Sequence, residues 1–354
     1  MSIVSPINIG DLTLEELRAE LEAMAERPFR AAQVFEGLYR EGLSDFAAFT
    51  TLPKPLREKL AARFTIGRLA LEARLESRDG TAKLVFRLRD GDCVETVLIP
   101  SGQRTTACLS TQAGCKFGCA FCASGLRGFR RNLAPSEITG QALHVARTAG
   151  AGVTNYVFMG MGEPLDNFDN LARAVRIMNA PEGMGIAARR LTVSTAGLVP
   201  GIERLKELDL QVNLSVSLHA ATDRLRSRLM PINRKYPLAA LIGACEDYLR
   251  AGGRMITLEY ILIKGTNDGP GDAEGLAGIA RRLRAKVNLI AYSPVPGLPF
   301  ETPSDGDVAR FRRRLEERKV RVTVRLSKGR DIFAACGQLA GRLGDEDRPD
   351  GARG

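Results

Sequence analysis

From about Thr105 onward, apolar segments with strand character alternate with segments of helical spacing. The strand segments are ACLS, VTNYVFM, RLTVST, VNLSVSL, MITLEYIL, VNLIA and VRVTVR, and helical stretches such as LAALIGACEDYL and DVARFRRRLEER separate most of them. This alternation is typical of a parallel sheet built from βα units. About six such units fit into the chain, fewer than a closed (βα)8 barrel needs. The sequence therefore predicts an α/β fold with a partial barrel.

Two segments precede this region. Residues 1–68 are predicted to form an N-terminal helical domain, because Thr13 and Glu16 match a capping box and leucines follow at helical spacing. Residues 69–104 are predicted to form a β-hairpin extension, because KLVFRLR alternates apolar and polar residues and two Asp-Gly pairs suit tight turns.

The remaining chain divides into a core and a tail. We expect residues 105–342 to form the barrel with a C-terminal loop, and the polar, Gly-rich residues 343–354 to be a disordered tail.

The charge balance points to an anionic partner. The net charge is +10, which favours nucleic acid or an anionic membrane, although solvated basic faces would also produce it. No apolar run approaches the roughly 18 residues of a membrane-spanning helix, and the first residues lack the pattern of a secretory signal. We expect a cytoplasmic protein without membrane contact.

Three of the seven cysteines lie close together in GCKFGCAFC, as Cys115, Cys119 and Cys122. A zinc site would need a fourth ligand, which Cys108 could supply. A [4Fe–4S] cluster normally takes four thiolates, so three would leave one iron open to a small molecule. An odd number of cysteines, most of them widely separated, indicates thiol or metal chemistry rather than a disulfide framework.

Other polar motifs follow the predicted strands directly. The cysteine triplet follows ACLS, GMGEP follows VFM, Ser194 ends LTVST and His219 follows VSL. In parallel α/β folds the carboxyl ends of the strands carry the chemistry. These motifs therefore predict one site at that edge of the sheet.

Together the motifs resemble the radical S-adenosylmethionine (SAM) superfamily. The segments ETVLIP, CLSTQAGCKFGC, FMGMGEPLDN, RRLTVSTAG, SVSLHA, LMPIN and AACGQLAG, with FRAAQVFEGLY and TTLPKPLREKL near the N-terminus, resemble the RlmN type of RNA methyltransferase. The resemblance covers nearly the whole chain. It implies a partial (βα)6 radical-SAM barrel with an N-terminal helical RNA-binding appendage, a small β extension and a C-terminal catalytic cysteine loop.

The resemblance also implies the reaction and its partners. The reaction would be methylation of adenine C2 in 23S rRNA, in the peptidyl-transferase region, and in the tRNA adenosine 3′ to the anticodon. Its cofactors would be a [4Fe–4S] cluster on Cys115, Cys119 and Cys122 and two SAM molecules per turnover. An electron donor such as flavodoxin or ferredoxin and a monomeric state are further expectations.

Three residues carry the implied catalytic roles. Cys336 would receive a methyl group from the first SAM, and a radical from the second SAM would activate that group for addition to C2. Cys108 would then attack the Cys336 sulfur and release the product as a disulfide forms. Glu95 would accept a proton at the target base. Without the resemblance, Cys108 would be read as core packing and Glu95 as an edge or ion-pair residue.

The SAM contacts are implied in the same way. Gly162 and Glu163 would hold the amino group, and further contacts would come from Ser194, Ser217, Leu218, His219 and Ser293. At Ser293 the family usually has Asn, and the shorter serine would give a weaker or water-mediated contact. Cys93 and Cys245 match no such motif and are interpreted as packing residues.

Two other functions stay open at this point. The sister Cfr type of methyltransferase modifies C8 of the same rRNA adenosine and shares the reactive cysteines, whereas Pro164 and the N-terminal segment resemble the C2 group more. A non-enzymatic RNA-binding protein with a structural metal is the more distant alternative. Radical tRNA thiotransferases are disfavoured because no second cysteine triplet is present.

Overall fold

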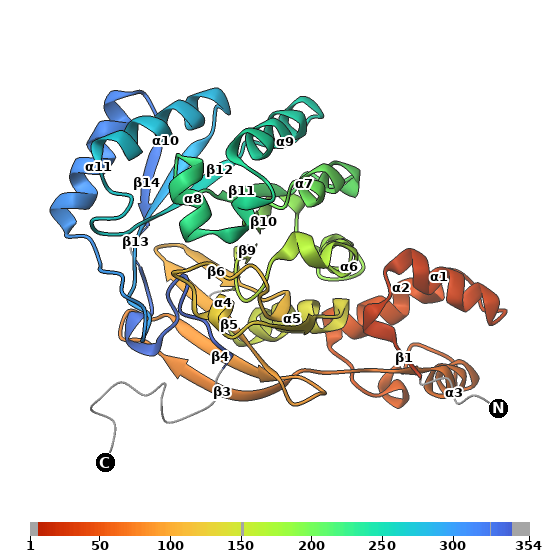
Figure 1. Cartoon of the computed structure of the whole chain (residues 1–354). Helices are drawn as coiled ribbons and strands as arrows, with labels where there is room; N and C mark the ends of the chain where they lie inside the picture. Colours follow the sequence, from red (N-terminus) through yellow and green to blue (C-terminus); the bar gives the residue numbers. More distant parts are fainter. Residues whose placement is uncertain (1–5, 150–151, 326, 342–354) are drawn as a thin grey trace, which may run out of the picture.

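The computed structural model describes residues 6–149, 152–325 and 327–341. Figure 1 shows a smaller N-terminal unit of helices beside a larger α/β body. The predicted tail, residues 343–354, lies outside the described residues.

The N-terminal unit is helical, as expected. Its elements are β1 (Ile7–Asn8), α1 (Leu14–Ala23), α2 (Arg30–Phe35) with a π-helical turn (Glu36–Glu41), α3 (Lys54–Arg63) and β2 (Phe64–Thr65). The predicted capping box is confirmed: Glu16 N donates to Thr13 Oγ1 (3.2 Å) and Thr13 N donates to Glu16 Oε2 (2.9 Å). The unit has its own apolar core, to which buried Ile177 of the barrel also contributes. Ile177 therefore joins the unit to the barrel.

The β extension is a three-stranded antiparallel meander. Its strands are β3 (Ala70–Glu76), β4 (Ala82–Arg87) and β5 (Cys93–Ser101). Gly80 and Gly91 adopt φ of 83° and 88°, so both predicted Asp-Gly turns are confirmed. The meander is not separate from the barrel, because β5 pairs with the first barrel strand and continues the same sheet.

The barrel strands all form where the sequence predicts them. They are β6 (Arg104–Cys108), β9 (Asn155–Phe158), β10 (Leu191–Thr195), β11 (Asn213–Ser217), β12 (Thr257–Leu262), β13 (Lys286–Ala291) and β14 (Val322–Arg325). Neighbouring strands pair in parallel in this order. In the described chain β14 and β3 are the two edges of the sheet, so the barrel is open.

Helices cover the outer face of this sheet (Figure 1). They are α5 (Pro135–Thr148), α6 (Phe168–Asn179), α7 (Val199–Leu205), α9 (Leu238–Arg250), α10 (Pro270–Arg282) and α11 (Asp305–Glu317), with the short α8 (Asp223–Leu229) between β11 and α9. Their apolar faces and the strands form one continuous core.

The segment after β14 crosses from one edge of the sheet to the other. Gly329 N donates to Asp79 Oδ2 (2.9 Å), Ser77 Oγ donates to Asp331 Oδ1 (2.6 Å), and Gly341 N donates to Glu95 Oε1 (2.9 Å). These contacts hold the segment that carries Cys336 against the β meander.

Candidate active site

The three clustered cysteines lie in a loop between two short paired strands, β7 (Gln112–Gly114) and β8 (Phe129–Asn132). Gly114 has φ of 74°, and a Cβ there would lie 1.9 Å from Gly128 O, so only glycine fits. The third cysteine, Cys122, directly precedes the short α4 (Ala123–Leu126). Ala123 N donates to Gly337 O (2.7 Å), which ties this loop to the Cys336 loop.

The arrangement of the thiols fits a cluster better than a single ion. Among the described residues no three His, Cys, Asp or Glu side chains converge as one metal ion would require, whereas in a [4Fe–4S] cluster each thiolate binds its own iron. Burial raises the pKa of Cys115 to about 12 and that of Cys119 well above its usual range, and the neighbouring thiols add to both shifts. Bound iron would offset this cost of ionising the thiols.

A cavity of about 150 Å³, here called the inner cavity, lies beside the cysteine loop. The predicted site residues that line it are Cys115, Cys119, Cys122, Gly162, Glu163, Ser194, Ser217, His219 and Cys336. Five elements distant in the sequence supply these side chains, so the fold brings together most of the predicted site.

Glu163 is a buried acid at the inner cavity, only 3% exposed. Its Oε2 accepts from Ala196 N (2.7 Å) and its Oε1 from Leu165 N (3.2 Å). Burial raises the pKa of Glu163 to about 7, although these amide hydrogen bonds act in the opposite direction. Gly162 has φ of 98°, and a Cβ there would lie 2.5 Å from Gln112 Cβ, so the loop must have glycine at this position.

His219 lines the same cavity and is held as a neutral ring. Burial lowers its pKa to about 3, and Arg226 adds to this effect. Its Nδ1 accepts from Ile261 N (3.0 Å), so Nε2 carries the hydrogen and acts as a donor. Its φ of 55° is unusual for histidine and turns the chain sharply after β11.

A second cavity of about 380 Å³, the outer cavity, adjoins the inner one. Both are lined by Cys122, Met159, Gly160, Ile290, Arg325, Cys336 and Gly337. Cys108, at the end of β6, lines only the outer cavity. Cys108 thus shares the outer cavity with Cys336 and with Cys122 of the triplet, and among the described residues it forms no metal-binding group with the three clustered cysteines.

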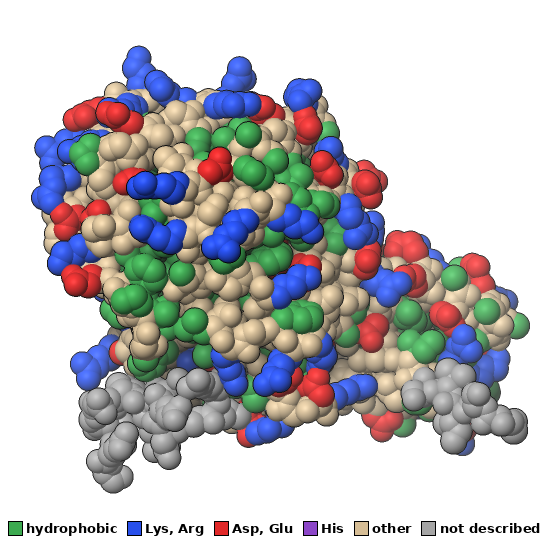
Figure 2. Space-filling model, in the orientation of Figure 1, with side chains coloured by type: hydrophobic (Ala, Val, Ile, Leu, Met, Phe, Trp, Pro, Cys, Tyr) green, Lys and Arg blue, Asp and Glu red, His purple; other side chains and the backbone are tan. Residues whose placement is uncertain are grey.

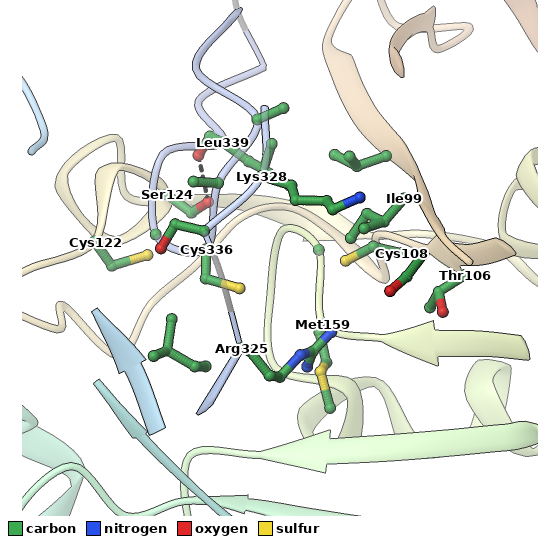
Figure 3. A pocket seen from close by; sticks show the side chains of 18 of the residues that line it. Ile99, Thr106, Cys108, Cys122, Ser124, Met159, Arg325, Lys328, Cys336 and Leu339 are labelled. Atoms are coloured by element: carbon green, nitrogen blue, oxygen red, sulfur yellow. Dashed lines mark hydrogen bonds between the residues drawn. The ribbon is translucent and has the colours of Figure 1, made fainter. Parts of the chain in front are cut away.

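Cys108 and Cys336 are both free thiols. In Figure 3 their side chains point into the outer cavity from opposite sides, and the Arg325 guanidinium approaches between them. Burial raises the pKa of Cys108 to about 12. Cys336 is exposed as a whole residue, yet burial of its thiol raises its pKa as well. Arg325 lowers the pKa of both thiols and so favours their reactive thiolate forms.

Three predicted residues line neither cavity. The Leu218 side chain packs in the main core, while its carbonyl accepts from Arg226 Nε (3.1 Å). Ser293 Oγ is buried and has no hydrogen-bond partner among the described residues. Glu95 is fully buried, beneath the end of the Cys336 loop.

The structure adds two site residues that the sequence reasoning missed. Glu259 on β12 is 4% exposed, lines the inner cavity and lies 4.0 Å from Arg325, measured from Oε2 to Nη1. An acid inside the apolar segment MITLEYIL is the same signal that singled out Glu95. Arg325 had no such signal, because it lies in a stretch with several other basic residues.

The surface around the site is rich in basic side chains. Figure 2 shows Lys and Arg spread around an area of hydrophobic side chains on the face where Figure 1 places α4 and α8. Two hydrophobic residues near the cysteine loop are exposed, Leu126 at 59% and Phe129 at 39%. In the described part of the chain, no helix has the length and apolar character needed to cross a membrane.

Comparisons with known proteins identify the family of this chain. Residues 109–273 match the model of the radical SAM superfamily, and residues 7–66 match that of the ribosomal RNA large subunit methyltransferase N-terminal domain. A dual-specificity RNA methyltransferase RlmN from Syntrophus aciditrophicus is 45% identical over 96% of this chain and 98% of its own length. The one from Geobacter sulfurreducens is 47% identical over 98% of this chain and 95% of its own length.

A solved structure extends the similarity to the fold. The crystal structure of a radical SAM methyltransferase from Sphaerobacter thermophilus has a TM-score of 0.89 and 47% identity, covering 95% of this chain and all of the other. The similarity includes both the N-terminal unit and the barrel. The chain therefore belongs to the RlmN family of radical SAM RNA methyltransferases.

Proposed function

We propose that this enzyme methylates C2 of one adenosine in the peptidyl-transferase region of 23S rRNA and of the adenosine 3′ to the anticodon in tRNA, in the cytoplasm. Its relatives are named dual-specificity RNA methyltransferases. The observation that carries the proposal is the pair of free thiols, Cys108 and Cys336, that face one cavity next to the cysteine triplet.

The inner cavity suits the two cofactors of the superfamily. Cys115, Cys119 and Cys122 would hold a [4Fe–4S] cluster with one open iron. With SAM bound there, the cluster supplies a carbon-centred radical. Glu163, whose carboxylate lines the cavity, would accept hydrogen bonds from the SAM amino group, and His219 would donate from Nε2.

The remaining predicted contacts are less direct. Ser194 and Ser217 line the inner cavity and would complete the SAM site. Ser293 would contribute through its buried Oγ, whose lack of a partner in the described chain is consistent with a missing polar ligand. Leu218 would act through its main chain.

Cys336 borders both cavities, which suits a group that must meet SAM on one side and RNA on the other. Its thiolate would attack the methyl group of the first SAM, and the S-methyl carbon would later bond to C2. Adenine C2 is electron-poor and cannot itself displace a methyl group from electrophilic SAM. The covalent route through cysteine avoids this difficulty.

Product release would use Cys108, which lines the outer cavity, and Glu95, which is buried beneath the end of the Cys336 loop. Once the S-methylene carbon has bonded to C2, the unpaired electron on the base would return to the cluster that donated it for SAM cleavage. Glu95 would take the C2 proton while the electron pair of the C–H bond stays on the base. The Cys108 thiolate would then attack the Cys336 sulfur, forming the S–S bond while the carbon leaves with its electron pair and takes up a proton. Forming the disulfide from the two thiols releases two electrons in total. Converting the second SAM to methionine and 5′-deoxyadenosine consumes two, so the two half-reactions balance.

The partners follow from this scheme. A flavodoxin or ferredoxin would supply electrons to the cluster, and a thiol reductant would restore Cys108 and Cys336 after each turnover. We propose that the enzyme acts as a monomer, since one chain supplies every group named above.

The test is nucleoside mass spectrometry of rRNA and tRNA from cells with and without the gene. We expect 2-methyladenosine to disappear from both RNAs in the deletion strain and to return with the wild-type gene. Loss of 8-methyladenosine instead would identify a Cfr-type enzyme, and an unchanged nucleoside profile would contradict the methyltransferase assignment.

A further inference from the structure

A buried lysine lies directly beside Glu95. Lys83 on β4 is 1% exposed, Glu95 on β5 is fully buried, and Lys83 Nζ lies 3.8 Å from Glu95 Oε1. Lysine is almost never fully buried unless it is paired, because desolvating its charge is costly. A lysine at this position therefore needs a reason beyond packing.

The same pair holds both ends of the Cys336 loop. Lys83 Nζ donates to Phe333 O (3.5 Å), before Cys336 in the sequence. Gly341 N, after Cys336, donates to Glu95 Oε1 (2.9 Å). The middle of the loop is fixed separately, through Ser124 Oγ and Leu339 O (2.6 Å). One ion pair thus contacts the loop that carries Cys336 both before and after that residue.

We propose that Lys83 is a positioning residue for product release, which holds Glu95 as a carboxylate and aligns it with the Cys336 loop. The inference rests on the proposed function, in which Glu95 takes the C2 proton. It adds a residue for which neither the motifs nor the two cavities give any signal, because Lys83 lines neither of them.

The charge of Lys83 is the part that can be tested. The groups that contact Glu95 include Lys83 from β4 and the Gly341 amide, and Arg127 at the end of α4 donates to Gly341 O (2.6 Å). Removing the nearest ammonium raises the pKa of a carboxyl group, so Glu95 would become a base only at higher pH.

The experiment measures adduct formation and release in single turnovers of the cluster-loaded enzyme with an RNA substrate. Lys83→Met removes the charge and the hydrogen bond to Phe333, whereas Lys83→Gln removes only the charge and keeps a donor. Arg87→Met is the matched control, since Arg87 lies on the same strand in an exposed pair with Glu72 (2.7 Å). Intact mass reports methylation of Cys336, and a denaturing gel reports RNA bound to protein.

Both Lys83 variants should still methylate Cys336 and form the adduct. Near neutral pH they should release product about tenfold more slowly, and release should recover when the pH is raised by about one unit or more. Glu95→Gln should be slow at every pH, the double variant Lys83→Gln/Glu95→Gln should match Glu95→Gln alone, and Arg87→Met should match the wild type.

Wild-type release near neutral pH in either Lys83 variant would overturn the inference. The inference also fails if their defect does not change with pH, if the two substitutions have additive effects, or if Cys336 is methylated but no adduct forms. Cys108→Ala is assayed in parallel. Absence of a protein–RNA adduct in this variant would contradict the proposed function itself. If the adduct is present, a failed prediction for the Lys83 variants counts against the role of Lys83 alone.

Discussion

At the scale of single residues, burial decides which groups are charged. Glu163 and His219 lie in the same cavity, and burial pushes both toward their neutral forms, with pKa values of about 7 and about 3. For His219 this means a fixed neutral donor at any physiological pH. For Glu163 it means that the charge of the carboxyl group changes near neutral pH.

SAM binding should therefore depend on the ionisation of Glu163. Below a pKa of about 7 the carboxyl group is protonated and must lose its proton before it can accept from the amino group. The affinity for S-adenosylhomocysteine should fall as the pH drops below this value, by up to about tenfold per unit. Equilibrium binding over pH would show this in the wild type.

Glu163→Gln is the control for this pH dependence. Glu163→Gln should bind S-adenosylhomocysteine more weakly, and its affinity should lack the change near neutral pH. Ionisation of the amino group of the ligand affects the affinity of both proteins. Parallel curves for the wild type and Glu163→Gln would contradict the assignment.

The clustered cysteines should be specific for iron. Replacing Cys115, Cys119 or Cys122 by alanine should abolish the brown colour and the roughly four irons per chain expected after anaerobic reconstitution. Cys245→Ala is the control, because Cys245 is buried in the main core and lines neither cavity. Stoichiometric zinc without iron in the wild type would contradict the cluster.

The sequence predicted most of the residues that line the two cavities. It did not predict which way the remaining side chains point. Motifs identified Glu163, His219 and Cys336 because each follows a strand or lies in a distinctive loop. They could not show that Leu218 packs in the core or that Glu95 lies beneath the Cys336 loop. Those facts depend on contacts between segments far apart in the chain.

At the scale of elements, local patterns were sufficient for most of the fold. The alternation of strands and helices predicted the parallel strands of the barrel, because a buried parallel strand is a short apolar run that differs clearly from an amphipathic helix. It did not predict the short parallel pair of β1 and β2 in the N-terminal unit. The pattern did not show that β3, β4 and β5 continue the main sheet. β5 and β6 pair as a hairpin across a short turn after Ser101, where the sequence analysis expected the β extension to end and the barrel to begin.

The contact between α6 and the N-terminal unit gives a test at this scale. Ile177 is fully buried in the core of that unit, so Ile177→Ala should leave a cavity and destabilise the contact by about 2–5 kcal/mol. Hydrogen exchange should increase in α1 and α2 while the barrel strands stay protected. Ile177→Val should cost only about 0.5–1.5 kcal/mol. Unchanged exchange in Ile177→Ala would show that the N-terminal unit does not depend on this contact.

At the scale of the whole molecule, the open barrel and the loop that spans the sheet edges enclose the two cavities of the candidate site. The outer cavity lies between β14 and the strands β5 and β6, and Cys336 and Gly337 line both this cavity and the inner one. The net charge of +10 suits a polyanionic substrate.

RNA binding should therefore weaken steeply with salt. Each neutralised phosphate of a single strand lowers the slope of log K against log[salt] by about 0.7. Binding of an anticodon stem-loop measured over a range of salt should show several such contacts, while S-adenosylhomocysteine binding, which involves no phosphate, should hardly change. Salt-independent RNA affinity would contradict an electrostatic RNA surface.

The central claim is that Cys336 carries the methyl group and Cys108 releases the product, and one denaturing gel tests it. Cys108→Ala should still accept a methyl group on Cys336 and still bond to RNA, but without the second thiol it cannot release the product. It should accumulate as a covalent protein–RNA species that shifts on a denaturing gel and disappears on nuclease treatment. Cys336→Ala and the double variant should show no shift. Normal turnover by Cys108→Ala, or a covalent adduct in Cys336→Ala, would contradict the account.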